Sequence, residues 1–354
     1  MLNFELPTFF PHRLIRGGNP QTIAGALLRG LPEPAGTTMD VVETTQGDSL
    51  ALFSNQPGDY RRLDTSADQA GATDKPVPDR DGRQVLLLHG LAGCHGSSYS
   101  VRAAHGLLQA GHGVFRMDAR GAGSGAKLAR YHHHAGRIED VQATVRHMTS
   151  CNPEMRITVV GFSLGANVLL KWLGSDEQQI PTNVDSAIAI APPADLGKCA
   201  ASLMTGFSRF YDGYFARLMI RRLRERRLLR PDMIDFPIQK KPEKLSQLDE
   251  ALTVPAGGFA SLTDYYDRCS SKDDISKIRI PTMIIVDELD PVIPIEMFSD
   301  IDSSPSVTVR RTRGGGHLGY IAGQNVAGQN ADPDRYWLGW RIVDIVNRIE
   351  AQCV

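Results

Sequence analysis

Short apolar runs alternate with stretches of helical spacing along most of this chain. Continuous runs rich in Val, Ile and Leu occur at 84–88, 114–117, 157–160 and 186–190. Such runs are typical of parallel strands that are buried on both faces. Apolar residues with helical spacing lie between these runs, at 99–110, at 138–148 and after 164. This order predicts an α/β fold with a mostly parallel central sheet, right-handed crossovers and helices on both faces.

The alternation stops after residue 195 and resumes near residue 278. The interval is rich in aromatic and basic residues and is predicted to be helical or irregular. Two more strands are predicted after it, at 282–286 and 307–311, followed by a terminal amphipathic helix at about 337–350. We therefore expect two core parts with a helical lid inserted between late strands, at 1–195, 196–272 and 273–354.

The stretch before the first buried strand is predicted to hold smaller elements. A short helix is expected to begin near Asn19. The segments 39–44 and 49–54 are joined by the turn residues Gln46-Gly47-Asp48, which predicts a hairpin at one edge of the sheet. The segment 57–83 is polar and poor in apolar residues, so we expect an exposed insertion there.

Composition narrows the class of protein. The chain has 354 residues, of which 42% are hydrophobic, and 39 basic residues balance 40 acidic ones for a formal net charge of −1. This balance gives no overall field that would attract nucleic acid. Neither a signal-peptide pattern nor an apolar run of 18 residues is found, and the odd set of cysteines is scattered, which predicts reduced thiols and a cytoplasmic protein. These cysteines are Cys94, Cys151, Cys199, Cys269 and Cys353.

The candidate chemistry begins with a serine between two glycines. The stretch Gly161-Phe162-Ser163-Leu164-Gly165 follows a predicted strand and precedes a predicted helix. A strand, a sharp turn and a helix with serine at the apex expose the hydroxyl at a helix N-terminus. The glycines are expected because a side chain at 161 or 165 would collide with neighbouring backbone. G-x-S-x-G also arises by chance in a chain with 34 glycines, so the strand and helix around it carry the argument.

A serine nucleophile needs a base, and the base needs an orienting carboxylate. Reactive groups in α/β sheets collect beyond the carboxyl ends of the strands. His317 follows the strand predicted at 307–311, and Asp287 and Asp290 follow the strand at 282–286. We expect Ser163, Asp290 and His317 to form a catalytic triad, with Asp287 as the rival acid.

Two backbone N–H groups should stabilise the oxyanion. One is expected from Leu164, directly after the serine, and the other from Leu91 in the loop after the strand 84–88. His89, in the same loop, is expected to position that loop.

Three other patterns in the sequence could indicate a binding site. His132-His133-His134 are consecutive, so they cannot all face one metal ion, and we expect structural histidines and no metal. The loop 121–125 is rich in glycine but lacks the Lys-Ser/Thr of a phosphate loop, so we expect no nucleotide site. A basic run in the lid predicts either a solvated helix face or contact with an anionic membrane surface or acidic head group. It comprises Arg217, Arg221, Arg222, Arg224, Arg226, Arg227 and Arg230.

The chain resembles the YheT-like branch of the α/β-hydrolase superfamily, which is related to the mammalian ABHD lipid esterases. The matching stretches cover most of the chain and read GGNPQTI, LLLHGLAGCHGSSY, FRMDARGAGSG, HHHAGRIEDV, GFSLGANVLLKWLG, DYYDRCSS, IRIPTMIIVDELDP and GGGHLGY. The resemblance implies the α/β-hydrolase fold and ester-hydrolase activity of the carboxylesterase or acylglycerol type. It places the nucleophile on Ser163, the acid on Asp290 and the base on His317. The insertion at 57–83 and the triple histidine depart from the family pattern.

These observations predict a serine hydrolase that cleaves carboxylic esters of short to medium chain or lipid-like character, with a small-molecule ester as its partner. The mechanism requires no metal or organic cofactor. The lid is expected to supply an apolar pocket lined by Phe207, Phe210, Tyr211 and Phe259. The alternatives are a thioesterase or amidase with the same triad, and a non-catalytic or transacylase member of the fold.

Overall fold

The computed structural model describes most of the chain, namely residues 2, 4–28, 30–45, 47–60, 62–63, 72–73, 82–175, 179–238, 240–299, 301–323 and 332–352. The insertion expected at 57–83 lies largely outside the described residues. Its described parts include a 3-10 turn, Pro57–Asp59, and two short antiparallel strands, β3 (Arg62–Leu63) and β4 (Ala72–Thr73).

Eight strands form one sheet in the order β1-β2-β6-β5-β7-β8-β9-β10. The first two strands form the predicted hairpin, which pairs antiparallel with β6, and all other neighbours are parallel. The predicted mostly parallel sheet is therefore confirmed. The strands are β1 (Thr38–Glu43), β2 (Ser49–Asn55), β5 (Gln84–Leu88), β6 (Gly113–Asp118), β7 (Ile157–Phe162), β8 (Val184–Ile190), β9 (Thr282–Asp287) and β10 (Val307–Thr312).

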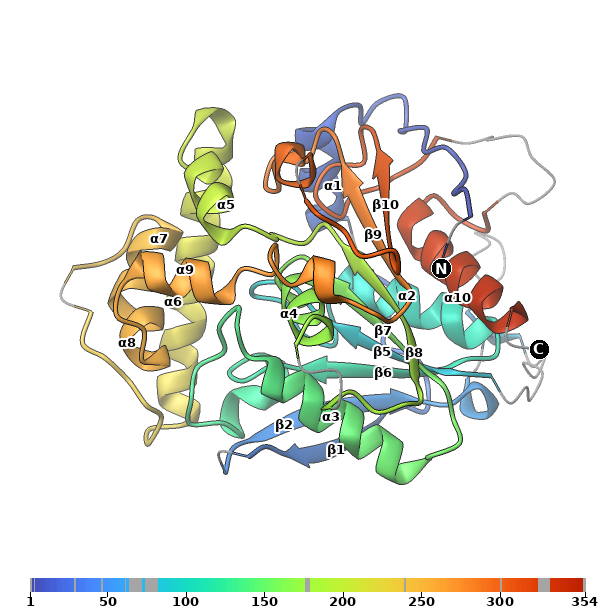
Figure 1. Ribbon diagram of the computed structural model, residues 1–354, viewed down its shortest axis with the longest axis horizontal. Coiled ribbons are helices and arrows are strands. Elements are labelled where there is room, and N and C mark those ends of the chain that lie inside the picture. The colour runs from blue at the N-terminus through green and yellow to red at the C-terminus, as the bar shows by residue number, and fades with distance from the viewer. Residues whose placement is uncertain are drawn as a thin grey trace.

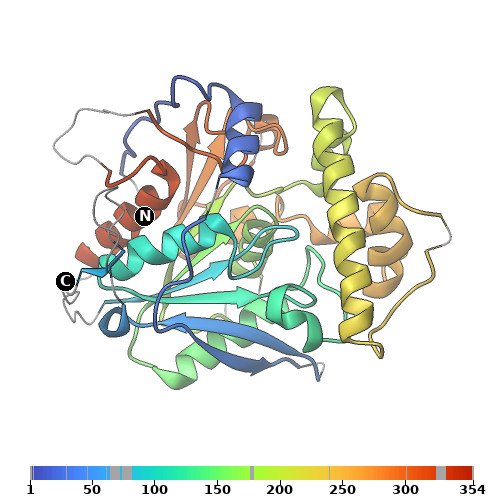
Figure 2. The same cartoon turned by 180° about the vertical axis from the view of Figure 1, so that it is seen from behind.

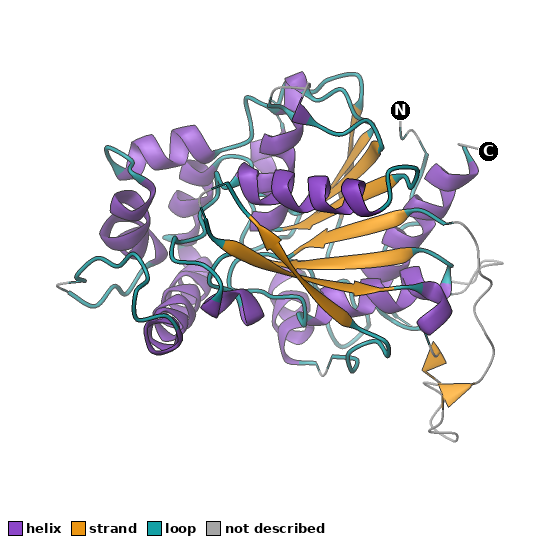
Figure 3. Ribbon diagram, turned by 90° about the horizontal axis from the view of Figure 1, so that it is seen from below, coloured by secondary structure: helices purple, strands orange, loops and turns teal. Residues whose placement is uncertain are grey.

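Helices cover both faces of this twisted sheet (Figure 3). The helices α3 (Ile138–Cys151) and α4 (Leu164–Leu173) lie on one face, and α2 (Ser98–Gln109) and α10 (Trp337–Ala351) pack together on the other (Figures 1 and 2). Every residue of β5, β7 and β9 is buried. Continuous apolar strands are stable here because helices remove both of their faces from water.

The segment between β8 and β9 folds into a separate group of helices on the left in Figure 1. It contains α5 (Leu196–Leu203), α6 (Arg209–Leu229), α7 (Leu245–Leu248), a π-helical turn (Asp249–Thr253), α8 (Val254–Gly257) and α9 (Leu262–Cys269). A small apolar cluster that includes Ile220, Leu223 and Leu252 holds α6 against the later helices. Among the described residues, no helix has both the length and the apolar character that a membrane span requires.

The helix α1 (Gly18–Leu27) joins the start of the chain to its last quarter. The side chain of Gln21 is fully buried, and its Nε2 donates hydrogen bonds to the carbonyls of Ile15 and Ile321, at 2.7 and 2.9 Å. Its Oε1 accepts a hydrogen bond from the Ile321 N–H at 2.7 Å. A buried amide with all of these partners satisfied fixes α1 firmly against the segment that follows β10.

Candidate active site

The strand, turn and helix predicted around Ser163 are confirmed. Ser163 connects β7 to α4 with φ 50° and ψ −119°, a backbone conformation that is strained for any residue other than glycine. A Cβ on Gly161 would lie 2.6 Å from the Cα of Ala166, and one on Gly165 would lie 2.5 Å from the carbonyl oxygen of His89. Both glycines are therefore required by close backbone approach, and the turn presents the serine hydroxyl at the start of α4.

The structure brings together the three side chains expected to form the triad. The Nε2 atom of His317 lies 3.0 Å from the Oγ of Ser163, and its Nδ1 lies 2.9 Å from the Oδ2 of Asp290. The imidazole is 9% exposed and the Asp290 carboxylate is 1% exposed. An imidazole with a carboxylate at Nδ1 carries its proton there, which leaves Nε2 free to accept the proton of the serine hydroxyl.

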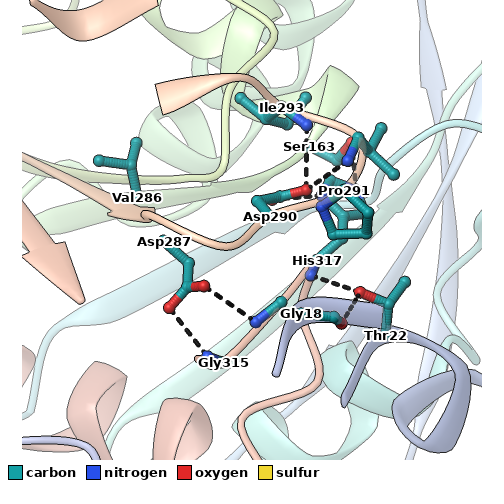
Figure 4. A network of polar contacts seen from close by, with 12 residues as sticks. Gly18, Thr22, Ser163, Val286, Asp287, Asp290, Pro291, Ile293, Gly315 and His317 are labelled. Carbon is teal, nitrogen blue, oxygen red and sulfur yellow. Dashed lines mark hydrogen bonds and ion pairs between the residues drawn. The ribbon is translucent and has the colours of Figure 1, made fainter. Parts of the chain in front are cut away.

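Asp290 is itself held by the loop that carries it. Its Oδ1 atom accepts hydrogen bonds from the N–H groups of Val292 and Ile293, at 2.7 and 2.9 Å (Figure 4). These two bonds occupy one carboxylate oxygen and direct the other toward His317.

Asp287, the rival acid, has a different position. Its carboxylate accepts hydrogen bonds of 2.8–3.2 Å from the backbone N–H groups of Leu289, Gly314, Gly315 and Gly316, and from the Thr312 hydroxyl. This carboxylate therefore binds the glycine loop that leads to the imidazole, and not the imidazole itself (Figure 4). We assign Asp287 as a positioning residue for that loop.

The helix α1 supplies a contact that the sequence did not reveal. The Thr22 hydroxyl accepts a hydrogen bond from the backbone N–H of His317 and donates one to the carbonyl of Gly18, both at 2.8 Å (Figure 4). Gly316 has φ 61°, and a Cβ there would lie 2.3 Å from the Gly18 oxygen. The family-like motif GGNPQTI was the only signal available, and it gave no indication that Thr22 would touch the histidine loop.

The two expected oxyanion donors are available. Leu164 is the first residue of α4, so its N–H has no acceptor within the helix. In the part of the chain that the structure describes, neither this N–H nor that of Leu91 donates a hydrogen bond to the protein. Both are therefore free to bind a developing oxyanion, and this role stays a prediction.

His89 supports the loop of Leu91. Its Nε2 accepts a hydrogen bond from the Ala119 N–H at 3.1 Å, so its Nδ1 donates to the Gly90 carbonyl at 2.8 Å. Burial lowers the pKa of His89, in keeping with a neutral ring that has an acceptor nitrogen. The Gly90 N–H donates to the Tyr99 hydroxyl at 2.9 Å, which fixes the same loop from the side of α2.

A cavity of about 610 Å³ opens at the serine and the histidine. One wall is formed by α6, through Phe210, Tyr211, Tyr214, Phe215 and Leu218, and another by α1. The Tyr211 hydroxyl donates to the Oδ1 of Asn19 at 2.8 Å and so ties the lid to α1 across the cavity. The volume of the cavity and its largely aromatic wall suit the apolar chain of a small ester.

Two of the four residues expected in the pocket do not line this cavity. Phe207 is 57% exposed and packs its ring against Phe210 and Tyr211 from outside. Phe259 packs against Tyr265 and His134 instead, with ring centroids 5.0 and 5.2 Å apart. The expectation fails for Phe259 because the later lid helices fold onto the histidine loop and away from the serine.

The triple histidine lies under the lid. His132 donates from Nε2 to the Ile234 carbonyl at 2.7 Å and accepts at Nδ1 from Arg226 at 3.0 Å. His134 accepts at Nδ1 from the Gly136 N–H at 3.1 Å. Two of these rings are thus engaged with separate protein partners. Burial, with Arg226 beside the ring, lowers the pKa of His132 to about 4.

This low pKa makes stability depend on pH. An unfolded histidine titrates near pH 6.5, so below that pH the unfolded chain takes up a proton that folded His132 refuses. Stability is therefore full above about pH 6.5 and falls by up to about 1.4 kcal/mol per pH unit down to about pH 4. We expect His132→Gln to reduce the slope of melting temperature against pH in this window. His147→Gln, at a half-buried position of α3, is the control, and an unchanged slope in the His132 variant would contradict the assignment.

One group of described residues has the spacing of metal ligands. The side chains of Cys94, His95 and Asp118 offer ligand atoms within 4.8 Å of one another. The Asp118 carboxylate, however, already accepts hydrogen bonds from the His95 N–H, the His95 Nδ1 and the Ser124 N–H, at 2.6–2.9 Å. The Asp118 carboxylate therefore holds two loops together. The proposed chemistry of Ser163 and His317 does not require a metal ion at these three residues.

The arginines of the basic run lie in different environments. Arg226 is buried and donates to the carbonyls of Ala129 and Tyr131 at 2.8 and 2.7 Å, so its role is structural. Arg227 and Arg230 pair with Asp235 and Asp232. Arg217 and Arg224 are exposed. Arg221 and Arg222 line the cavity. The expected contact with an anionic membrane stays a prediction.

Known proteins resemble this chain in sequence and in structure. The alpha/beta hydrolase fold family matches residues 84–324. The chain is 29% identical over 295 residues to YheT of Escherichia coli, covering 81% of each protein. It is 23% identical over 322 residues to phospholipase ABHD3 of Mus musculus, covering 89% of this chain and 74% of that protein. The esterase Pf2001 of Pyrococcus furiosus superimposes with a TM-score of 0.53 and 18% identity, over 89% of this chain and 93% of that one.

Proposed function

Since this chain belongs to the alpha/beta hydrolase fold family, we propose that it is a serine hydrolase that cleaves carboxylic esters with Ser163, His317 and Asp290. One observation carries the proposal. The imidazole of His317 bridges the serine hydroxyl and a buried carboxylate, at 3.0 and 2.9 Å, on the wall of an apolar cavity. The relatives to which the chain is similar include esterases and lipases, which supports ester hydrolysis as the reaction.

The proposed mechanism follows from the direction of these hydrogen bonds. His317 Nε2 takes the proton of Ser163 as its Oγ attacks the ester carbonyl, and Asp290 stabilises the imidazolium that forms. The N–H groups of Leu91 and Leu164 bind the oxyanion. The imidazolium then protonates the leaving alcohol. Water, deprotonated by the same nitrogen, attacks the acyl-enzyme and releases the acid.

The residues that line the cavity indicate which kind of ester it could bind. Its aromatic wall on α6 and the apolar residues of α1 would bind an acyl chain largely through the hydrophobic effect. At about 25 cal/mol per Å² of buried apolar surface, each methylene adds about 0.8 kcal/mol of binding. We therefore propose short- to medium-chain or lipid-like esters as substrates.

A fluorophosphonate probe tests the proposal without knowledge of the substrate. The probe phosphonylates a serine only when a base activates it. We expect one label per chain, on the peptide that carries Ser163, and far slower labelling after His317→Ala. Acid-denatured protein is the control for non-specific reaction. Native protein that stays unlabelled, or that carries its label on another residue, would refute the assignment.

A further inference from the structure

The cavity beside Ser163 carries an unusual charge for this protein. Arg102, Arg221 and Arg222 line it, and none of the aspartates and glutamates that the structure describes does. The whole chain has a formal net charge of only −1, so the positive charge is local to this cavity. A concave site with low-dielectric walls focuses such a field and attracts ligands of opposite sign.

Arg222 combines partial burial in the cavity wall with hydrogen-bonding capacity that is largely unused. It is half-buried, and its Nη1 donates to the Gly93 carbonyl at 3.0 Å. It forms no ion pair with any residue in the described ranges. A guanidinium has five N–H donors, so most donors of Arg222 have no acceptor among the residues that the structure describes. The bond to Gly93 holds the side chain beside the loop that carries the proposed oxyanion donor Leu91.

The other two arginines differ in the contacts that they make with other residues. Within the described ranges Arg221 forms one ion pair, with Glu225 at 3.8 Å, and both side chains are largely exposed. Such a pair contributes little and leaves the guanidinium available. Arg102 stacks on the ring of Tyr336, 3.5 Å from its centroid, and is influenced by Asp334. The inference therefore rests on Arg221 and Arg222, and Arg102 adds to the local field.

The charged and apolar parts of the cavity follow one another along α6. The aromatic residues at 210–215 are followed, about two turns later, by Arg221 and Arg222. Arg222 lies seven positions after Phe215 in the helix, a distance of about 10 Å at 1.5 Å per residue. One wall of the cavity thus offers apolar surface and then positive charge, which fits a molecule with an apolar chain and an anionic group.

We propose that the substrate is an amphiphilic ester with an anionic oxygen group, a carboxylate or a phosphate, that Arg222 binds with help from Arg221. The inference rests on the proposed ester hydrolysis and adds the charge of the substrate to it. A guanidinium matches both anions because it can present two parallel N–H donors. The preference for such a substrate follows, because an anion satisfies donors that a neutral ester leaves unpaired.

Two matched pairs of esters test the inference. Decanoylglycerol and decanoylglycerol phosphate differ by an anion on the alcohol side. p-Nitrophenyl octanoate and mono-p-nitrophenyl suberate differ by a carboxylate at the end of the acyl chain. We expect kcat/KM to favour the anionic member of at least one pair, which identifies the side that Arg222 serves. This preference should fall about tenfold in Arg222→Gln, because a hydrogen bond to a charged group is lost, and it should fall in high salt.

Matched variants separate charge from other effects. Arg224→Gln removes the same charge from an exposed position of α6 and should keep the preference. Arg222→Lys keeps the charge and should retain part of it. Fluorophosphonate labelling of Ser163 and an unchanged melting temperature show that Arg222→Gln is folded. Wild-type protein that prefers neither anionic ester, or a preference that Arg222→Gln leaves intact, would overturn the inference. Absence of hydrolysis of every ester, neutral ones included, would instead count against the proposed function.

Discussion

Ser163→Ala is expected to lower kcat for p-nitrophenyl butyrate by about a million-fold, to the rate that binding and the oxyanion donors alone support. The variant lacks the proposed nucleophilic oxygen, and no other described hydroxyl forms a hydrogen bond with His317 Nε2. Alanine at this position removes only the hydroxyl, so the strained turn and both neighbouring glycines keep their packing. Release of p-nitrophenolate, followed by absorbance at saturating substrate, measures the effect.

Ser98→Ala is the matched control for this variant. Ser98 lies in the same cavity, at the start of α2, and its removal should leave turnover close to that of the wild type. The melting temperature of Ser163→Ala should remain within a few degrees of the wild-type value, because strain at the turn belongs to the backbone. A Ser163→Ala protein that turns over more than about one thousandth as fast as wild type would reject the serine mechanism.

Asp290→Asn is expected to lower kcat by about 10⁴, as loss of the orienting carboxylate does in serine hydrolases with this arrangement. The amide can still accept the N–H groups of Val292 and Ile293, so the loop should keep its shape. The amide nitrogen would instead donate to His317 Nδ1, which places the ring proton on Nε2 and blocks it from accepting the serine proton. Measurements of kcat and of the melting temperature on the same variant check that activity is lost while stability is kept.

Asp287→Asn provides the comparison that decides between the two carboxylates. Its oxygens accept from four backbone N–H groups and one hydroxyl, so loss of the charge should destabilise the loop before His317. We expect a fall of about 3 kcal/mol in the free energy of unfolding. The loss of kcat in the folded protein should be smaller than in Asp290→Asn. A larger loss in Asp287→Asn would exchange the roles of the two residues.

The parts of this fold that the sequence predicted are those set by local pattern. The buried strands, the hairpin and the turn at Ser163 follow from apolar periodicity and glycine spacing, and the structure confirms them. The family resemblance is confirmed as well. Asp290 could only be favoured over Asp287, because only two residues lie between them and the direction of each carboxylate depends on hydrogen bonds to the backbone of the surrounding loops.

The contacts missed from the sequence are those between distant segments. Thr22 and His317 are 295 positions apart, and no local pattern links a threonine in a short helix to a histidine loop near the other end of the chain. Phe259 was assigned to the wrong surface for the same reason. An aromatic residue in the lid is expected to pack against other apolar groups, but its identity does not show which of two neighbouring surfaces it will cover.

The helix α1 has a consequence for how the protein matures. Because Gln21 and Thr22 hold the loop of His317, the imidazole is placed only after the two ends of the chain have met. A nascent polypeptide can complete the turn at Ser163 well before β10 emerges from the ribosome, yet the imidazole is ordered only once residues 317–321 have joined α1. The proposed hydrolytic activity should therefore depend on α1, and removal of residues 1–30 should abolish it while leaving most of the sheet in place.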